Sequence, residues 1–190
     1  ASSLEGANQQ LKAGLIAGQE YPIMNQVIKP GYIYGLTAAT DETTLDFRII
    51  GNWYDATKAK ELAGSMFDNG IDVILAIAGG ANQGIVAAAK ERGKYVLWFD
   101  SNGYDIAPGT VIGSSAILQD KAAYVKTKEA IEGELEFGTA EIAGVKEGYV
   151  RFIEDDELYR RNVPEEIREK QHTVIEKLKS GELTLDMQTF

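Results

Sequence analysis

The residues best suited to bind a ligand form a loop that follows a continuous apolar run, residues 72–78. Gly79 and Gly80 lack a β-carbon, so the backbone can turn sharply there and a ligand can approach the main chain closely. Asn82 can cap a helix that begins near Gln83, and the free N–H groups at such a helix start favour an oxygen-rich ligand. The glycine spacing does not meet the dinucleotide fingerprint G-x-G-x-x-G. The pattern is consistent with a ligand-binding loop and equally with a purely structural tight turn.

Two further side chains that could bind a ligand also follow expected strands. Trp53 comes after residues 45–51, and its flat face can either stack on a planar ring or cover the end of the core. Asp100 comes after residues 95–99, and its carboxylate can accept two hydroxyl hydrogen bonds, as from a ribose diol, or cap the next turn. Because parallel strands end at the same edge of a sheet, we expect Trp53, Gly80 and Asp100 to share that edge.

The composition of the 190-residue chain argues against several classes of protein. The net charge is -10 and the basic residues are scattered singly, so no basic stripe is present for nucleic acid. Without cysteine, the chain has no disulfide, no thiolate metal site and no thiol nucleophile. The only histidine, His172, falls on an expected surface helix, which gives a histidine metal centre or a Ser-His-Asp relay little support. We therefore expect no metal, no cofactor and no nucleic-acid partner.

A run of four acids, residues 154–157, stands near Arg160 and Arg161. Paired carboxylates can hydrolyse glycosides, but an acidic run beside arginines is more typical of a solvated loop or helix start. No apolar run approaches the ~20 residues that span a membrane. Residues 1–10 lack the charged and apolar regions of a signal peptide. As given, we expect a soluble, globular chain.

Apolar runs and helical patterns alternate from residue 12 to residue 116. This alternation is typical of an α/β fold, an open parallel sheet wound by helices through right-handed crossovers. The Pro-Gly pair at residues 30–31 is expected to kink or interrupt the first helix. A further helix is expected over residues 119–132, and residues 182–190 can pair as a short edge strand. The predicted sheet has about five strands, residues 12–18, 45–51, 72–78, 95–99 and 140–145, with another strand over residues 110–116.

Several motifs recur in a specific order along the chain. They are the glycine-ended strand at residues 12–18, Gly51-Asn52-Trp53 followed by residues 55–63, residues 78–84, Lys94-Tyr95 leading to Asp100-Ser101, residues 145–148, and the closing segments 164–167 and 180–182. In order and spacing they resemble the basic membrane protein family, the PnrA-like substrate-binding lipoproteins of bacterial ABC transporters. The resemblance runs from about residue 12 to the end of the chain.

The resemblance implies a two-lobed, type I periplasmic-binding-protein-like fold that binds a purine nucleoside-like molecule between its lobes. Trp53 stands where the family has an aromatic residue stacked on the base. Gly79, Gly80 and Asn82 lie in the loop expected to touch the ligand. Asp100 matches the acid that holds the ribose hydroxyls.

Two departures from the family pattern stand out. Ile117 occupies the position where the nucleoside binders place a lysine. The first lobe, with its own stacking aromatic and the lipid-bearing cysteine, would precede residue 1. The resemblance thus divides the chain into a ligand-binding lobe (residues 1–116), a crossover helix of the missing first lobe (117–139), and a return strand with the C-terminal helix (140–190). Without its first-lobe partner, the helix at residues 119–132 is expected to fold back onto the sheet or to be covered by a second copy in a homodimer.

The expected function is that of a solute-binding component of an ABC-type importer, which binds a nucleoside-like ligand, contacts a transporter permease and performs no chemistry. The full-length protein would be an extracytoplasmic lipoprotein anchored to the membrane. A flavin or a sugar remains an alternative ligand. The competing class is a nucleotide- or sugar-processing α/β enzyme that uses Asp100, although no histidine, cysteine or Walker-type lysine stands beside the glycine loop. A regulatory domain would need a DNA-binding segment that this chain does not contain.

Overall fold

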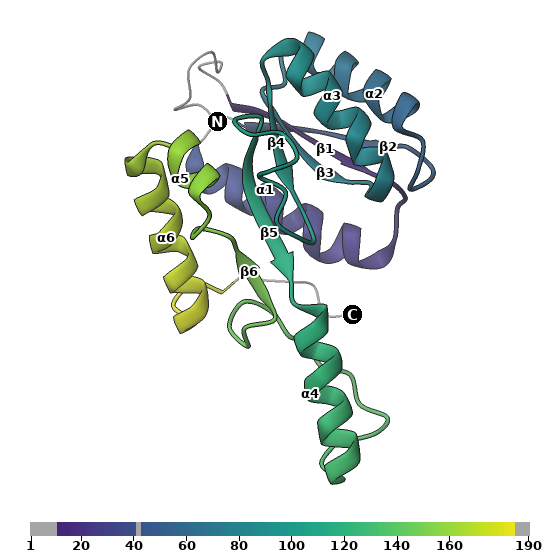
Figure 1. Ribbon diagram of the computed structural model, residues 1–190, viewed down its shortest axis with the longest axis vertical. Helices are drawn as coiled ribbons and strands as arrows, with labels where there is room; N and C mark the ends of the chain where they lie inside the picture. Colours follow the sequence, from purple (N-terminus) through teal and green to yellow (C-terminus); the bar gives the residue numbers. More distant parts are fainter. Residues whose placement is uncertain (1–10, 41–42, 185–190) are drawn as a thin grey trace.

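A computed structural model describes residues 11–40 and 43–184 of the chain (Figure 1). These residues form a six-stranded sheet in the order β2-β1-β3-β4-β5-β6. Strands β1 to β5 run parallel, and β6 pairs antiparallel with the end of β5. The predicted α/β fold with an open, mostly parallel sheet is therefore confirmed. The strands are β1 (Leu11–Ala17), β2 (Thr43–Ile49), β3 (Val73–Ile77), β4 (Tyr95–Trp98), β5 (Val111–Ile117) and β6 (Val150–Phe152).

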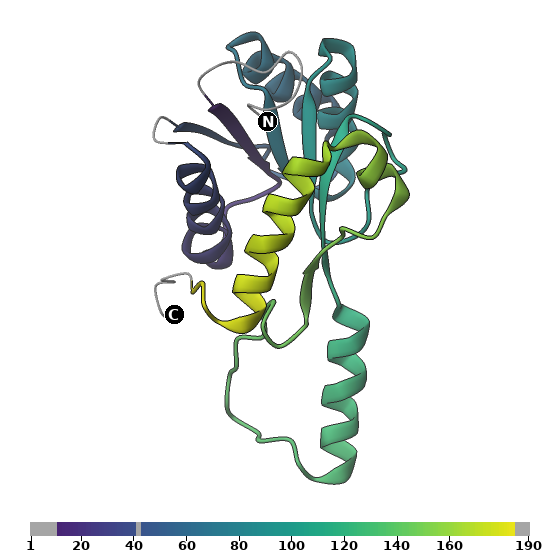
Figure 2. The ribbon, with the colours of Figure 1, turned by 90° about the vertical axis from the view of Figure 1, so that its left-hand side faces the viewer.

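Helices cover both faces of this sheet (Figures 1 and 2). Alternate residues of β1 show the division, because successive side chains of a strand point to opposite faces. Ile16 packs in the cluster that contains α2 and α3, whereas Leu15 packs with η1 and with Tyr32 of α1. The helices are η1 (Met24–Ile28, π-helical), α1 (Lys29–Ala39), α2 (Ala56–Asp68), η2 (Gly79–Ala81, 3₁₀), α3 (Asn82–Arg92), α4 (Gln119–Glu132), α5 (Glu157–Asn162) and α6 (Glu165–Ser180).

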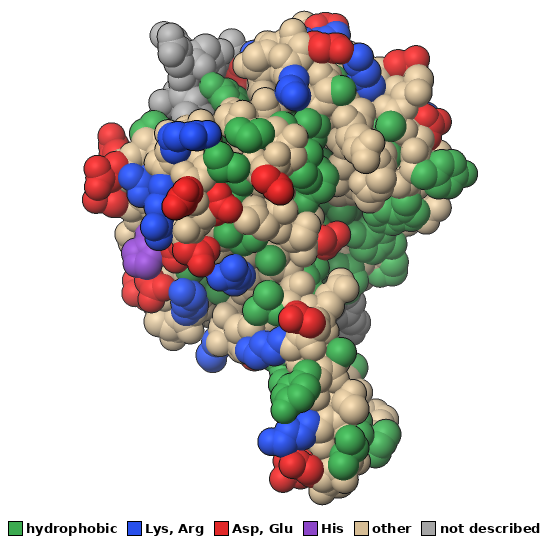
Figure 3. All heavy atoms as spheres, in the orientation of Figure 1, with side chains coloured by type: hydrophobic (Ala, Val, Ile, Leu, Met, Phe, Trp, Pro, Cys, Tyr) green, Lys and Arg blue, Asp and Glu red, His purple; other side chains and the backbone are tan. Residues whose placement is uncertain are grey.

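Helix α4 projects from the body of the protein (Figure 2). None of its residues is buried, and Tyr124 and Ile131 are 71% and 81% exposed. The space-filling view shows apolar side chains on this projecting part (Figure 3). The prediction that the helix folds back onto the sheet is therefore wrong, because β5 leads almost directly into α4 and carries it beyond the end of the sheet. The alternative, a covering second copy of the chain, stays a prediction.

The segment after α4 runs beside that helix instead of joining the sheet (Figure 2). Lys126 of α4 makes ion pairs with Glu129 at 3.0 Å and with Glu141 of this segment at 2.6 Å. The predicted strand over residues 140–145 is wrong, because a strand needs a hydrogen-bonded neighbour and this segment lies away from the sheet. The chain rejoins the sheet only at β6, beside β5.

The irregularity expected at residues 30–31 takes the form of η1. The N–H of Lys29 bonds to the carbonyl of Met24, five residues back, and Pro30 then falls in the first turn of α1, where its missing N–H costs little. The edge strand expected over residues 182–190 lies largely outside the described residues. None of the helices within the described ranges is long and apolar enough to cross a membrane.

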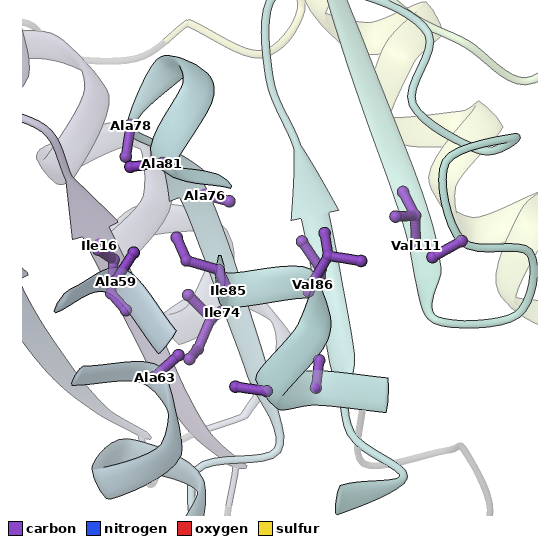
Figure 4. Packing of buried hydrophobic residues seen from close by; sticks show 14 of the residues in the cluster. Ile16, Ala59, Ala63, Ile74, Ala76, Ala78, Ala81, Ile85, Val86 and Val111 are labelled. Carbon is purple, nitrogen blue, oxygen red and sulfur yellow. The ribbon is translucent and has the colours of Figure 1, made fainter. Parts of the chain in front are cut away.

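Small side chains let α2 and α3 pack closely on the sheet (Figure 4). Ile16 and Ile74 of the strands lie in one hydrophobic cluster with Ala63 of α2 and with residues of α3. Ile16, Ala63 and Ile74 are fully buried. A β-carbon at Gly84 would overlap the carbonyl oxygen of Ala56, so α3 approaches α2 this closely because residue 84 is glycine. The last glycine of the loop motif therefore serves helix packing.

Candidate functional site

The loops that follow β1, β2 and β3 are held together by backbone hydrogen bonds at the carboxyl edge of the sheet. The N–H of Gly18 donates to the carbonyl of Ile77, and the carbonyl of Gly18 accepts from the N–H of Gly51, both at 2.8 Å. The N–H of Ala81 donates to the carbonyl of Trp53 at 3.2 Å. The predicted meeting of Trp53 with the glycine loop at this edge is therefore observed.

Trp53 is positioned by the turn that contains it. The side-chain oxygen of Asn52 accepts hydrogen bonds from the N–H groups of Tyr54 and Asp55, at 3.0 and 2.7 Å. Asp55 then caps α2 by accepting from the N–H of Lys58 at 2.9 Å, as the sequence predicted. Two consecutive side-chain caps fix the backbone on both sides of the tryptophan.

The indole of Trp53 lies over the backbone of Gly18. A β-carbon at Gly18 would lie 2.5 Å from Cε3 and 2.6 Å from Cδ2 of this ring, so the ring is in contact with the glycine Cα. Trp53 nevertheless remains 38% exposed. One part of the indole is thus seated on the protein while the rest is open to solvent, which is the arrangement that stacking on a planar ligand needs.

Sequence reasoning missed an aromatic partner of Trp53, which is Tyr21. The two ring centroids are 6.1 Å apart and the ring planes are tilted by 47°. An aromatic residue three positions beyond a strand-ending glycine is a weak signal, because nothing local shows which other loop it meets.

The glycine loop forms the short helix η2, in which Gly79 has a positive φ of 56°. A β-carbon at Gly79 would come within 3.2 Å of the carbonyl oxygen of Trp53, so glycine is required both for the turn and for the close approach. The loop therefore has a structural role, and it also leaves Gly80 exposed at the edge.

Asn82 does not cap helix α3, so that prediction is wrong. Its side chain is only 5% exposed and points into the loop, where its oxygen accepts from the N–H of Ala78 at 2.8 Å and its amide donates to the carbonyl of Ala76 at 3.4 Å. The start of α3 has no side-chain cap. The buried side-chain amide bonds to backbone groups inside the loop, so Asn82 stabilises the loop's conformation.

Asp100 has a backbone conformation that marks it out. Its φ of 79° is the only positive φ of a non-glycine residue in the described ranges, and such conformations concentrate at functional sites. The N–H of Ile117 donates to the carbonyl of Asp100 at 3.2 Å, which ties this residue to the end of β5. The side chain is exposed, yet the surrounding protein partly desolvates it and raises the carboxyl pKa above its ordinary 3.8.

Tyr21 links the two halves of the site. Burial raises the pKa of its hydroxyl, and the negative charge of Asp100 raises it further. The Tyr21 ring contacts Trp53, and the loops that carry Trp53, Tyr21 and Asp100 follow β2, β1 and β4 at the same carboxyl edge of the parallel strands. Within the described residues, no group of three or more acidic or histidine side chains is placed to hold a metal ion.

A buried polar network supports the loop that follows Asp100. The hydroxyl of Ser114 accepts from the N–H of Gly103 at 2.9 Å and donates to the carbonyl of Ser101 at 3.1 Å. The hydroxyl of Tyr104 accepts from the N–H of Ser114 at 3.0 Å and donates to the carbonyl of Ile153 at 2.9 Å. This network joins the loop to β5 and to the residue after β6, and no local sequence pattern predicts it.

The fold of this chain is also found in solute-binding proteins of known structure. It superposes on an ABC transporter solute-binding protein from Aeropyrum pernix K1 with a TM-score of 0.73 and 24% identity, covering 95% of this chain and 58% of that one. Residues 7–184 match the family described as ABC transporter substrate-binding protein PnrA-like, and the chain belongs to this family.

Two curated relatives show the extent of the similarity. Basic membrane protein D of Borreliella burgdorferi (strain JD1) is 28% identical over 155 residues, which cover 80% of this chain and 45% of that protein. The ABC transporter nucleoside-binding protein BmpA of Lactococcus lactis subsp. cremoris (strain MG1363) is 31% identical over 84 residues, or 44% of this chain and 24% of that protein. The chain spans about half the length of basic membrane protein D.

Proposed function

We propose that this chain supplies one ligand-binding lobe of the solute-binding component of an ABC importer, and that its ligand is a purine nucleoside-like molecule. The planar ring of the ligand stacks on the open part of Trp53, and its hydroxyl groups bind the carboxylate of Asp100. Gly79 and Gly80 let the ligand approach the backbone of their loop closely, and Asn82 stabilises the conformation of that loop.

The observation that carries this proposal is the seating of the partly exposed Trp53 indole on Gly18, at the sheet edge where Asp100 also lies after β4. A tryptophan that only covered the core would be buried, whereas this one is held in place and still 38% exposed. A carboxylate beside an exposed aromatic surface suits a ligand with a planar ring and adjacent hydroxyls. A relative named as a nucleoside-binding protein agrees with this chemistry.

The chain's own residues support binding without catalysis. The single histidine, His172, lies on α6 and contacts Glu154 at 2.9 Å. Both residues lie outside the loops that carry Trp53, Tyr21 and Asp100. With the only histidine on α6, we assign the Asp100 carboxylate the role of a hydrogen-bond acceptor for the ligand rather than that of a catalytic base. Contact with a transporter permease, and attachment outside the cytoplasm through a lipid, belong to the same proposal.

A thermal-shift panel tests the ligand class. Ligands that bind the native state raise its melting temperature by an amount that grows with the ratio of ligand concentration to Kd. We expect guanosine or inosine to stabilise the chain, whereas D-ribose alone, which lacks a ring to stack, does not. Stabilisation by riboflavin alone would instead identify a flavin as the ligand. Conversion of any of these compounds by the chain would contradict the binding-protein assignment.

A further inference from the structure

Tyr21 is held in place by the protein on several sides. Its ring packs against the buried cluster that contains Leu15, Met24 and Ile77. Its carbonyl accepts a hydrogen bond from the N–H of Asn25 at 3.3 Å, in the first turn of the helix that follows. The ring therefore has a fixed position beside Trp53 and little freedom to swing away.

The angle between the two rings shapes the space that they border. With centroids 6.1 Å apart and planes tilted by 47°, Tyr21 and Trp53 form an aromatic corner that cannot clamp a ligand between parallel faces. A planar ring stacked on Trp53 would meet Tyr21 at its own edge. The edge of a nucleoside base is where the sugar is attached.

Tyr21 follows β1 and Asp100 follows β4, and one strand, β3, separates β1 from β4 in the sheet. Burial and the charge of Asp100 both disfavour ionisation, so the hydroxyl stays protonated and able to donate at neutral pH. Among the described residues, no hydrogen bond of this hydroxyl is seen. A hydroxyl donor and a carboxylate acceptor therefore stand at the same edge of the sheet, and these are the two groups that a sugar's hydroxyl and ether oxygens require.

We propose that Tyr21 is a specificity-determining residue, whose ring borders the ligand's planar group and whose hydroxyl donates to a sugar oxygen of the same ligand. The inference rests on the proposed function and extends it. Trp53 stacks on the planar ring, and Asp100 accepts hydrogen bonds from the sugar hydroxyls. Tyr21 contacts both the ring and a sugar oxygen, so it favours ligands in which the two are joined. The site would then prefer a nucleoside to the free base.

The test compares inosine with hypoxanthine, its free base, by ligand-observed NMR titration of the 190-residue chain. The Tyr21→Phe variant keeps the ring and loses the donor, so its preference for inosine over hypoxanthine should fall by about 3- to 10-fold, as expected for one hydrogen bond. The Tyr21→Leu variant removes the ring and should weaken both compounds. Tyr34→Phe, an exposed tyrosine on α1, is the matched control and should change neither affinity.

The outcomes separate this inference from the proposed function. Wild-type binding of inosine together with an unchanged preference in Tyr21→Phe would overturn the role of Tyr21 and leave the proposed function standing. A wild-type chain that binds neither compound would overturn both. A melting temperature of Tyr21→Phe equal to that of the wild type would show that any loss of preference comes from the missing donor and not from altered folding.

Discussion

Replacing Gly18 with alanine should displace Trp53 and thereby remove the ligand-binding surface. The new β-carbon would lie 2.5 Å from Cε3 of the indole, where ordinary contacts are 3.4 Å or more, so the two must separate by about 1 Å. Gly18 itself cannot retreat, because its N–H and its carbonyl are both hydrogen-bonded at 2.8 Å to neighbouring strand ends. Its φ is not positive, so alanine brings no backbone strain, and the effect is purely one of crowding.

Overpacking of this kind costs about 1–3 kcal/mol of unfolding free energy. Urea unfolding followed by circular dichroism measures that loss, and tryptophan emission reports movement of the indole. Gly35→Ala is the matched control: no atom lies within 4 Å of the position of its new β-carbon, and the site is exposed inside α1, so it should stabilise the chain by about 0.5–1 kcal/mol. Unchanged stability and emission in Gly18→Ala would refute the seating of Trp53 on Gly18.

Three further changes test other parts of the structure. Gly84→Ala should lower the unfolding free energy by about 3 kcal/mol in urea unfolding, because its β-carbon overlaps the carbonyl of Ala56; an unchanged value would contradict the close approach of α2 and α3. Tyr104→Phe should cost about 1–3 kcal/mol, because the N–H of Ser114 loses its buried acceptor; native-like amide exchange at Ser114 would contradict this. The folded chain raises the Asp100 pKa and so binds more protons there than the unfolded chain does, which means that this group's contribution to stability increases as pH falls toward 3.8. The Asp100→Asn variant, whose side chain tolerates a positive φ, should lack this contribution, so its urea midpoint should gain less than that of the wild type as pH falls. Identical pH profiles of the urea midpoint in the variant and the wild type would contradict this.

The elements that sequence reasoning predicted well are those whose signals are local. Helix α4 begins and ends at the predicted residues, Gln119 and Glu132, and Asp55 caps α2 as expected. Strands β3 and β4 lie in uninterrupted apolar runs that stop at Gly79 and Asp100. Burial on both faces gives such strands a continuous apolar run, so they can be recognised without knowledge of their neighbours.

The errors came from properties that depend on neighbours in space. Residues 140–145 have a strand-like composition, yet they lie beside α4, where no strand is available to pair with them. Asn82 follows paired glycines as a helix cap often does, but its amide is buried and bonds inside the loop. Tyr21 and the hydroxyl of Ser114 act through contacts with residues more than ten positions away, which no local pattern records.

Saturation-transfer NMR with guanosine tests the central claim most directly, because it detects weak binding and reports which ligand protons touch the protein. We expect strong transfer to the base proton in the wild-type chain, loss of that signal in Trp53→Ala, and its retention in Tyr54→Ala, the neighbouring tyrosine that is 81% exposed. Transfer to the base that persists in Trp53→Ala, or its absence from the wild type, would contradict the account of this site.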